Sequence, residues 1–207
     1  MHSYFITTWG ITNILLLISF IFGIAKYSVL RKEEKQYVFY IGFLLFIEAA
    51  TNFLTVVLHY KDTSFLYPIY IAGEFFLLTS LFIRKLGVLK YGLIPILILT
   101  VGFLIVNKFF DTYFNDDVVK VTSNIIIVCF AGYTLLQQIK NNKSVNRFTL
   151  VDACIFFYYS VSVFIFIIQH QIATLSEDNY YAILGTNNIL SSILYGSFIY
   201  TFIKLKK

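Results

Sequence analysis

The sequence predicts an all-α membrane protein, a bundle of seven transmembrane helices. Its 207 residues are 58% hydrophobic and only 13% charged, with a mean hydropathy of +0.77. This composition is too apolar for the surface of a water-soluble domain. Apolar runs of about 20 residues recur along the chain, which is the length needed to cross a hydrocarbon core roughly 30 Å thick. The basic residues are concentrated in alternate loops, as in multi-pass membrane proteins.

Seven apolar stretches are long enough to be spans, and each is expected to be a helix because lipid cannot satisfy an open backbone. Strands of a barrel would be about half as long and would alternate polar with apolar residues. The connecting loops are short, so we expect residues 1–207 to form a single transmembrane domain. The predicted spans are residues 8–30, 38–60, 64–84, 88–107, 118–139, 150–170 and 181–203.

The charge of the loops predicts the orientation of the chain. Thirteen of the 16 Lys and Arg residues follow spans one, three, five or seven, and only Lys61, Lys108 and Lys120 fall on the other side. By the positive-inside rule, the C-terminus is cytoplasmic and the N-terminus is external. The net charge of +5 is therefore interpreted as a topology signal, and no nucleic-acid partner is expected.

Span two places polar side chains where water is scarcest. Glu48 lies about 15 Å along its helix at roughly 1.5 Å per residue, and Asn52 follows one turn later. Thr51, Thr55 and His59 continue the same three- and four-residue spacing, which marks one face of a helix. A charged group that faces lipid is costly, so we expect this face to point into the bundle.

Span three carries a second carboxyl group at a similar depth, Glu74, on a stripe with Tyr67 and Tyr70. A short loop joins spans two and three, so they are expected to be antiparallel neighbours whose carboxyl groups face each other. No Lys or Arg lies near the middle of any span, and neither Glu48 nor Glu74 has an obvious ionic partner. Burial and a like-charged neighbour both favour a protonated carboxyl group, so we expect at least one of them to carry a proton at neutral pH.

Spans six and seven add further polar stripes, with Tyr158, Ser162 and Gln169 in span six and Asn188, Ser191, Ser192 and Tyr195 in span seven. Intramembrane carboxyl groups are usually functional. The alternative is interhelical hydrogen bonding without further function, worth about 0.6–2 kcal/mol. Asp152, near the cytoplasmic end of span six, is expected to start a helix with access to water. The predicted site for a proton, a cation or a small ligand comprises Glu48, Asn52, Tyr70, Glu74, Asn188 and Tyr195.

Other chemistry is not predicted. The sequence has no His-Glu-x-x-His, Gly-x-Ser-x-Gly or Gly-rich phosphate motif, so we expect no catalytic residues and no cofactor. His59 and His170 map to the external side, but without the spacing of metal ligands. A metal site is therefore not predicted, and an external site at these two histidines is the weaker alternative.

Two segments resemble a known group of proteins. YPIYIAGEFFLL (67–78), with Tyr67, Tyr70, Glu74 and Phe75, and NNILSSILYGSF (187–198) are similar to segments of small seven-helix membrane proteins of Bacteroidota-type bacteria. The resemblance implies a multi-pass protein of the bacterial cytoplasmic (inner) membrane and implies no activity. The chain differs from the microbial rhodopsins because span seven has no lysine, and from the hemolysin/progestin-receptor families because their intramembrane histidines are absent.

Three functions stay open at this point. The first is a receptor-like or transporter-like bundle that holds a proton, cation or small ligand between spans two, three, six and seven. The second is an oligomeric pore, or a membrane effector or accessory protein of a defence or signalling system, with copies of itself or another protein as partners. The third, ranked last, is an enzyme that acts on lipid with Glu48 and Glu74 as an acid–base pair. All three require the lipid bilayer as a partner.

Overall fold

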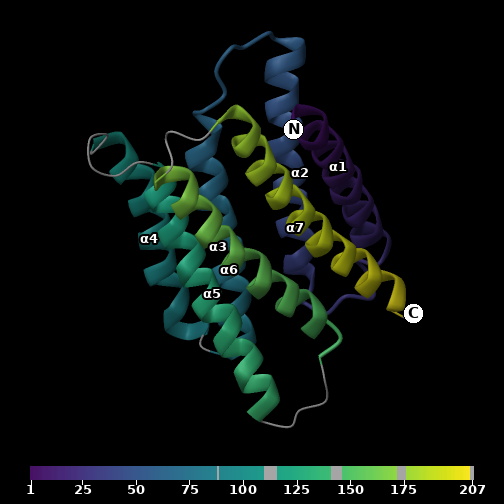
Figure 1. Ribbon diagram of the computed structural model, residues 1–207. Helices are drawn as coiled ribbons and strands as arrows, with labels where there is room; N and C mark the ends of the chain where they lie inside the picture. The colour runs from purple at the N-terminus through teal and green to yellow at the C-terminus, as the bar shows by residue number, and fades with distance from the viewer. Residues whose placement is uncertain (88, 110–115, 141–145, 172–175, 206–207) are drawn as a thin grey trace.

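The computed structural model describes residues 1–87, 89–109, 116–140, 146–171 and 176–205, and in these residues every regular element is a helix (Figure 1). The all-α prediction is therefore confirmed for the described part of the chain. The elements are α1 (His2–Ala25), α2 (Lys35–Asn52), the π-helical turn η1 (Phe53–Val57), α3 (Leu66–Leu86), α4 (Leu89–Phe109), α5 (Asp116–Lys140), α6 (Thr149–Gln171) and α7 (Glu177–Lys204).

Six helices are long and apolar enough to cross a membrane: α1, α2 with η1, α3, α5, α6 and α7. The fourth predicted span, 88–107, corresponds to the backbone of α4, many of whose side chains lie outside the described residues. Large apolar side chains cover the exterior, and Phe46, Leu136 and Phe164 are each about two-thirds exposed (67%, 66% and 65%). Such a surface is compatible with an integral membrane protein whose outer face contacts lipid.

Two helix boundaries differ from the predicted spans. The first helix ends at Ala25 and not at residue 30, because the chain turns at Lys26, whose ammonium group donates to the Leu205 main-chain oxygen (2.8 Å). The second span starts at Lys35 and changes character after Asn52, where the Leu58 N–H donates to the Phe53 carbonyl in a wider, π-type turn (3.2 Å). π-type turns of this kind occur frequently at functional sites.

The helices form a closed ring. In the part of the chain that the structure describes, α1 packs against α2 and α7, α2 against α3, α3 against α5, α5 against α6, and α6 against α7, while α4 packs on the outside of α3. Spans two and three are thus neighbours, as expected. The start of α1, the end of α2 with η1, and the start of α7 lie together at the top of Figure 1.

Aromatic side chains fill the opposite end of the ring. The rings of Tyr37 and Phe148 stack with centroids 4.7 Å apart and an interplanar angle of 8°. Phe198 and Phe202 of α7 pack edge-on against Tyr37 and Phe148, respectively, at 5.7 and 5.9 Å. All four side chains are essentially inaccessible to solvent. This end of the bundle is therefore a solid core.

Ion pairs reinforce the same end. Asp152 is fully buried; it forms a salt bridge with Lys85 and accepts a hydrogen bond from the Tyr37 hydroxyl group. The prediction that Asp152 has access to water is therefore wrong. It lies at the start of α6, as expected, but α3 supplies a lysine that compensates its charge.

A second pair joins two loops at this end. Arg147 donates from Nε and Nη2 to the two carboxylate oxygens of Glu34 (2.7 and 2.5 Å), which also accepts from the Arg31 main-chain N–H (2.8 Å). Burial alone would raise the pKa of Glu34, but the hydrogen bonds and charge of Arg147 and Arg31 outweigh it and hold this pKa below its ordinary value of 4.5. The pair therefore stabilises the fold above pH 4.5, and this contribution is lost as the pH falls through the lowered pKa.

We expect Glu34→Gln to lower Tm at neutral pH by roughly 2–4 °C, about 1 kcal/mol for a pair discounted for solvent screening. The variant should also lose less stability than the parent protein on acidification, because it lacks the carboxyl group that becomes protonated. Thermal unfolding in detergent at neutral and acidic pH measures both effects. Glu33→Gln, at the exposed neighbouring position, is the control, and equal losses in the two variants would contradict the assignment.

Candidate functional site

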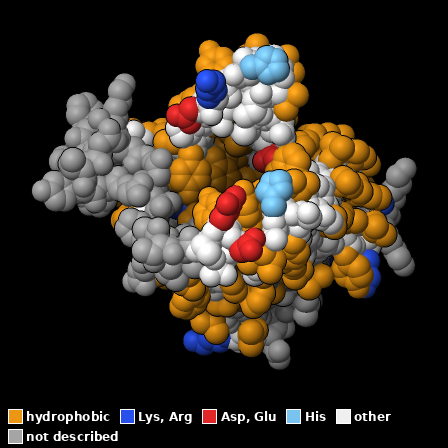
Figure 2. All heavy atoms as spheres, turned by 45° about the horizontal axis from the view of Figure 1, so that its top comes forward, with side chains coloured by type: hydrophobic (Ala, Val, Ile, Leu, Met, Phe, Trp, Pro, Cys, Tyr) orange, Lys and Arg blue, Asp and Glu red, His pale blue; other side chains and the backbone are white. Residues whose placement is uncertain are grey.

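A cavity of about 520 Å³ lies inside the ring at the end opposite to the aromatic core. Its walls come from α1, α2, the start of α3, α6 and α7. Figure 2 looks toward this end and shows a hollow in the surface, with hydrophobic side chains around it and acidic side chains on either side. The volume is within the range of sites for small molecules.

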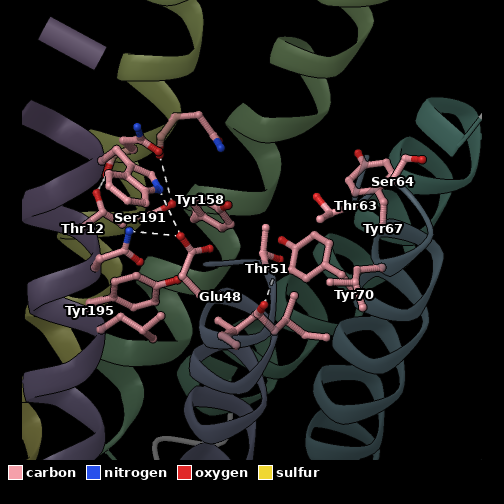
Figure 3. Close-up of a pocket in the computed structure, with 18 residues that line it drawn as sticks. Thr12, Glu48, Thr51, Thr63, Ser64, Tyr67, Tyr70, Tyr158, Ser191 and Tyr195 are labelled. Carbon is pink, nitrogen blue, oxygen red and sulfur yellow. Dashed lines mark hydrogen bonds between the residues drawn. The ribbon is translucent and has the colours of Figure 1, made fainter. Parts of the chain in front are cut away.

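Glu48 is the one acidic residue among those that line the cavity. Its side chain is half-buried and is turned toward α1, where Trp9 Nε1 and Asn13 Nδ2 both donate to Oε1 (3.0 and 3.1 Å; Figure 3). The second oxygen, Oε2, accepts no hydrogen bond from any described residue. One carboxylate oxygen is thus held in place while the other is left for a ligand or water.

The contribution of α1 to the site was not predicted from the sequence. Trp9, Thr12 and Asn13 all line the cavity. Their three- and four-residue spacing is the same signal that marked the polar stripe of span two. The same search for polar residues at helical spacing would have identified Trp9, Thr12 and Asn13 in span one.

α6 and α7 form the wall across from α3. Asn188 and Tyr195, both predicted as site residues, line the cavity together with Tyr158, Asn187 and Ser191. The hydroxyl group of Thr12 lies 2.9 Å from both the Asn188 main-chain oxygen and the Ser192 hydroxyl group, so α1 and α7 are joined directly beside the cavity.

The α3 wall links the cavity to a second polar cluster. Tyr67 and Tyr70 line the cavity, with stacked rings whose centroids are 6.1 Å apart. The Tyr70 hydroxyl group donates to Glu74 Oε1 (2.9 Å). Tyr70 therefore has a ring in the wall of the cavity and a hydroxyl group in the buried cluster.

Glu74 is the centre of that cluster and is 1% exposed. It forms a salt bridge with Lys120 of α5 and accepts a hydrogen bond from the Tyr159 hydroxyl group of α6 (2.6 Å). Tyr40 of α2 lies 2.9 Å from Tyr159, hydroxyl to hydroxyl, and extends the cluster. The cluster thus joins four of the six helices of the ring.

The predicted pair of facing carboxyl groups is not formed. Glu48 has its partners on α1, whereas Glu74 has its partners on α3, α5 and α6. The prediction that Glu74 lacks a cationic partner is wrong, because Lys120, assigned from the sequence to the external end of a span, is 2% exposed and reaches the carboxylate. A long, flexible lysine stem can carry its charge well away from the backbone position that a sequence reveals.

The six residues of the predicted site are thus divided. Glu48, Tyr70, Asn188 and Tyr195 line the cavity, and Glu74 is bonded to one of them but lies behind the wall. Asn52 is the last residue of α2, directly before the π turn, and is not among the lining residues.

Only two of the three histidine side chains, those of His2 and His59, belong to the described part of the structure. His59 is exposed and has a left-handed backbone (φ 53°) at the end of the π turn, and His2 packs edge-on against Tyr181 (5.1 Å). The side chain of His170 lies outside the described residues. Within the described residues, no group of three or more metal-ligating side chains is brought together.

Comparison of the chain with protein-family models, with curated proteins and with solved structures found no match. The function must therefore be inferred from the geometry of the site itself.

We expect substitution of either Glu74 or Lys120 to destabilise the protein strongly, by about 3–5 kcal/mol. The reason is that the remaining partner is then an uncompensated charge in the interior. Lys120→Met and Glu74→Gln test this by thermal unfolding in detergent. The double variant Glu74→Gln/Lys120→Met should be more stable than Lys120→Met alone, because no buried charge then lacks a partner. Additive losses in the double variant would contradict a coupled pair.

Proposed function

We propose that the protein is an integral membrane protein that binds a small ligand inside its helical bundle, in the manner of a receptor or a transporter. The observation that carries this proposal is the half-buried carboxylate of Glu48, which is held by two N–H donors on one oxygen and open toward a 520 Å³ cavity on the other. An oxygen that accepts no hydrogen bond from the protein takes its partner from water or from a ligand, and the cavity is the space in which that partner would lie.

The residues around the cavity support the binding of a ligand more than the conduction of ions through a pore. None of the aromatic residues that pack the opposite end lines the cavity. A pore through a single chain would need a polar path through that packed end, where the described side chains are stacked rings and compensated ion pairs. The alternative of a pore built from several copies calls for a different surface and has no specific support among the described residues.

The geometry also gives little support to a lipid-acting enzyme. An acid–base pair must reach the same reacting atoms. Glu74 is behind the cavity wall and neutralised by Lys120, so it does not share a substrate position with Glu48.

We propose that the cavity opens to the external side of a bacterial cytoplasmic membrane. Lys85, Arg147 and Lys204 lie toward the end of the bundle opposite to the cavity, and basic residues are retained on the cytoplasmic side. A ligand would then enter from outside the cell.

This orientation can be tested with reporter fusions at the C-terminus. We expect a fused green fluorescent protein to be fluorescent and a fused alkaline phosphatase to be inactive, because the former matures in the cytoplasm and the latter outside it. The same reporters placed after residue 62, in the loop between α2 and α3, should give the opposite pattern. An active phosphatase at the C-terminus would contradict the proposed orientation, because it would place the C-terminus outside the cytoplasm.

The accessibility of the cavity can be tested with a cysteine at Thr51, a lining residue that is half-buried, one turn after Glu48 (Figure 3). With Cys129 and Cys154 replaced by alanine, Thr51→Cys should react with small water-soluble methanethiosulfonate reagents in intact membranes. The reason is that a cavity open to the surface admits a water-soluble reagent.

Thr134→Cys is the matched control. Both threonines donate to the carbonyl four residues earlier (2.9 Å for Thr51, 2.8 Å for Thr134), but Thr134 is only 3% exposed and lies on α5. We expect at least a tenfold slower reaction there, corresponding to about 1.4 kcal/mol. Equal protection of both positions would show that the cavity is closed and would remove the basis of the proposed function.

A further inference from the structure

We propose that the ligand of this cavity is an organic ammonium ion, a primary or quaternary amine with an apolar body of modest size. This inference rests on the proposed function and deepens it by assigning the chemical class of the ligand. It follows from the charge, the aromatic lining and the coordination capacity of the cavity.

The first argument is charge. The residues that line the cavity include one carboxylate, Glu48, and no Lys, Arg or His. The nearest buried ammonium group described, that of Lys120, is neutralised by Glu74 behind the wall. The donors that Glu48 does have, Trp9 and Asn13, are neutral. An ionised Glu48 is therefore a negative charge that no lining residue compensates, so it would attract a cation and repel an anionic ligand.

The second argument is the aromatic lining. Trp9, Tyr67, Tyr158 and Tyr195 line the cavity in addition to Tyr70. In Figure 3 the Glu48 carboxyl group lies between the rings of Tyr158 and Tyr195. Aromatic faces attract cations within about 6 Å of the ring centroid, and this combination is the usual way in which proteins recognise alkylammonium groups. The protein itself provides an internal example, because Lys120 Nζ lies 4.3 Å from the centroid of the Tyr70 ring.

The third argument separates an organic from an inorganic cation. Small inorganic cations need several hard oxygen ligands at once, typically about six or more. Glu48 offers one open carboxylate oxygen, because its other oxygen is occupied by two donors. No group of three or more His, Cys, Asp or Glu side chains that could hold a metal ion is found among the described residues. The Thr, Ser and Asn side chains of the lining offer further oxygens, but these are uncharged. An ammonium group, whose charge is spread over several atoms and accepted by one carboxylate and by ring faces, fits this set better.

The entrance of the cavity is suited to the same ligand. Asp62 is in the loop between α2 and α3, Glu177 and Asp178 begin α7, and all three side chains are exposed. Asp178 forms a salt bridge with the N-terminal ammonium group (3.4 Å), so Asp62 and Glu177 carry this argument. Figure 2 shows acidic side chains on either side of the hollow. Acidic groups around an opening raise the local concentration of cations and speed their association.

The experiment uses the same Thr51→Cys protein and compares two reagents of similar size and opposite charge. One carries a trimethylammonium group and the other a sulfonate group, and each rate is divided by the rate with a free thiol. We expect the cationic reagent to react about tenfold faster after this normalisation, equivalent to about 1.4 kcal/mol. Adding Glu48→Gln should bring the two normalised rates close together, whereas Glu33→Gln, an exposed acid at the opposite end of the bundle, should leave the preference unchanged.

A second measurement leaves Glu48 unchanged, so that it does not depend on the folding of the variant. Millimolar choline should slow the labelling of Thr51→Cys, and its neutral isostere 3,3-dimethyl-1-butanol should not. Equal normalised rates for the two reagents, equal protection by the isostere, or equal protection by sodium chloride would each overturn the assignment of an ammonium ligand. Absence of labelling by any reagent would instead overturn the proposed open cavity, so the two failures can be distinguished.

Discussion

The salt bridge between Glu74 and Lys120 determines what the two intramembrane carboxyl groups can do. Glu48 and Glu74 belong to neighbouring helices, and the sequence places them at similar depths in their predicted spans. Among the described residues, only Glu74 has a cationic partner. Because charge in a medium of low polarity must be compensated, Glu74 is committed to the protein, where it joins α2, α3, α5 and α6 through Tyr40, Tyr70 and Tyr159. Glu48 is left as the carboxyl group with an open oxygen.

The two clusters are nevertheless in physical contact. Tyr70 contributes its ring to the cavity wall, its hydroxyl group to Glu74, and a ring face to the ammonium group of Lys120. A ligand that displaces this ring changes a hydrogen bond within a buried, charged network. Tyr70 is therefore the residue that joins the cavity wall to the buried network of contacts between helices.

Much of the fold follows from the sequence, because the requirement for long apolar helices in lipid leaves few alternatives. The positions of the helices are of this kind, and so are Glu48, Asn188 and Tyr195 in the cavity wall. The predicted stripe of span two faces inward only in part, because Thr55 and His59 are exposed. The ionic partners were not predictable in the same way. Lys120 and Lys85 lie near helix ends, where a sequence suggests contact with water, but their long side chains turn inward to Glu74 and Asp152. The packing of the bundle determines which helix lies opposite a given carboxyl group. The periodicity of a single helix does not predict this.

The division of polar residues between the two ends of the ring explains why the cavity lies at one end of the bundle. At one end, α1, α2, α6 and α7 present hydroxyl and amide side chains at helical spacing, and these short groups leave space between the helices. At the other end, Tyr37, Phe148, Phe198 and Phe202 fill the same space, and the ion pairs of Asp152 and Glu34 join the helices and loops around them. Packed interiors resist continuous deformation. Any opening of the cavity toward the aromatic end would therefore require the stacked rings to separate. Access to the cavity from its own end requires no such rearrangement.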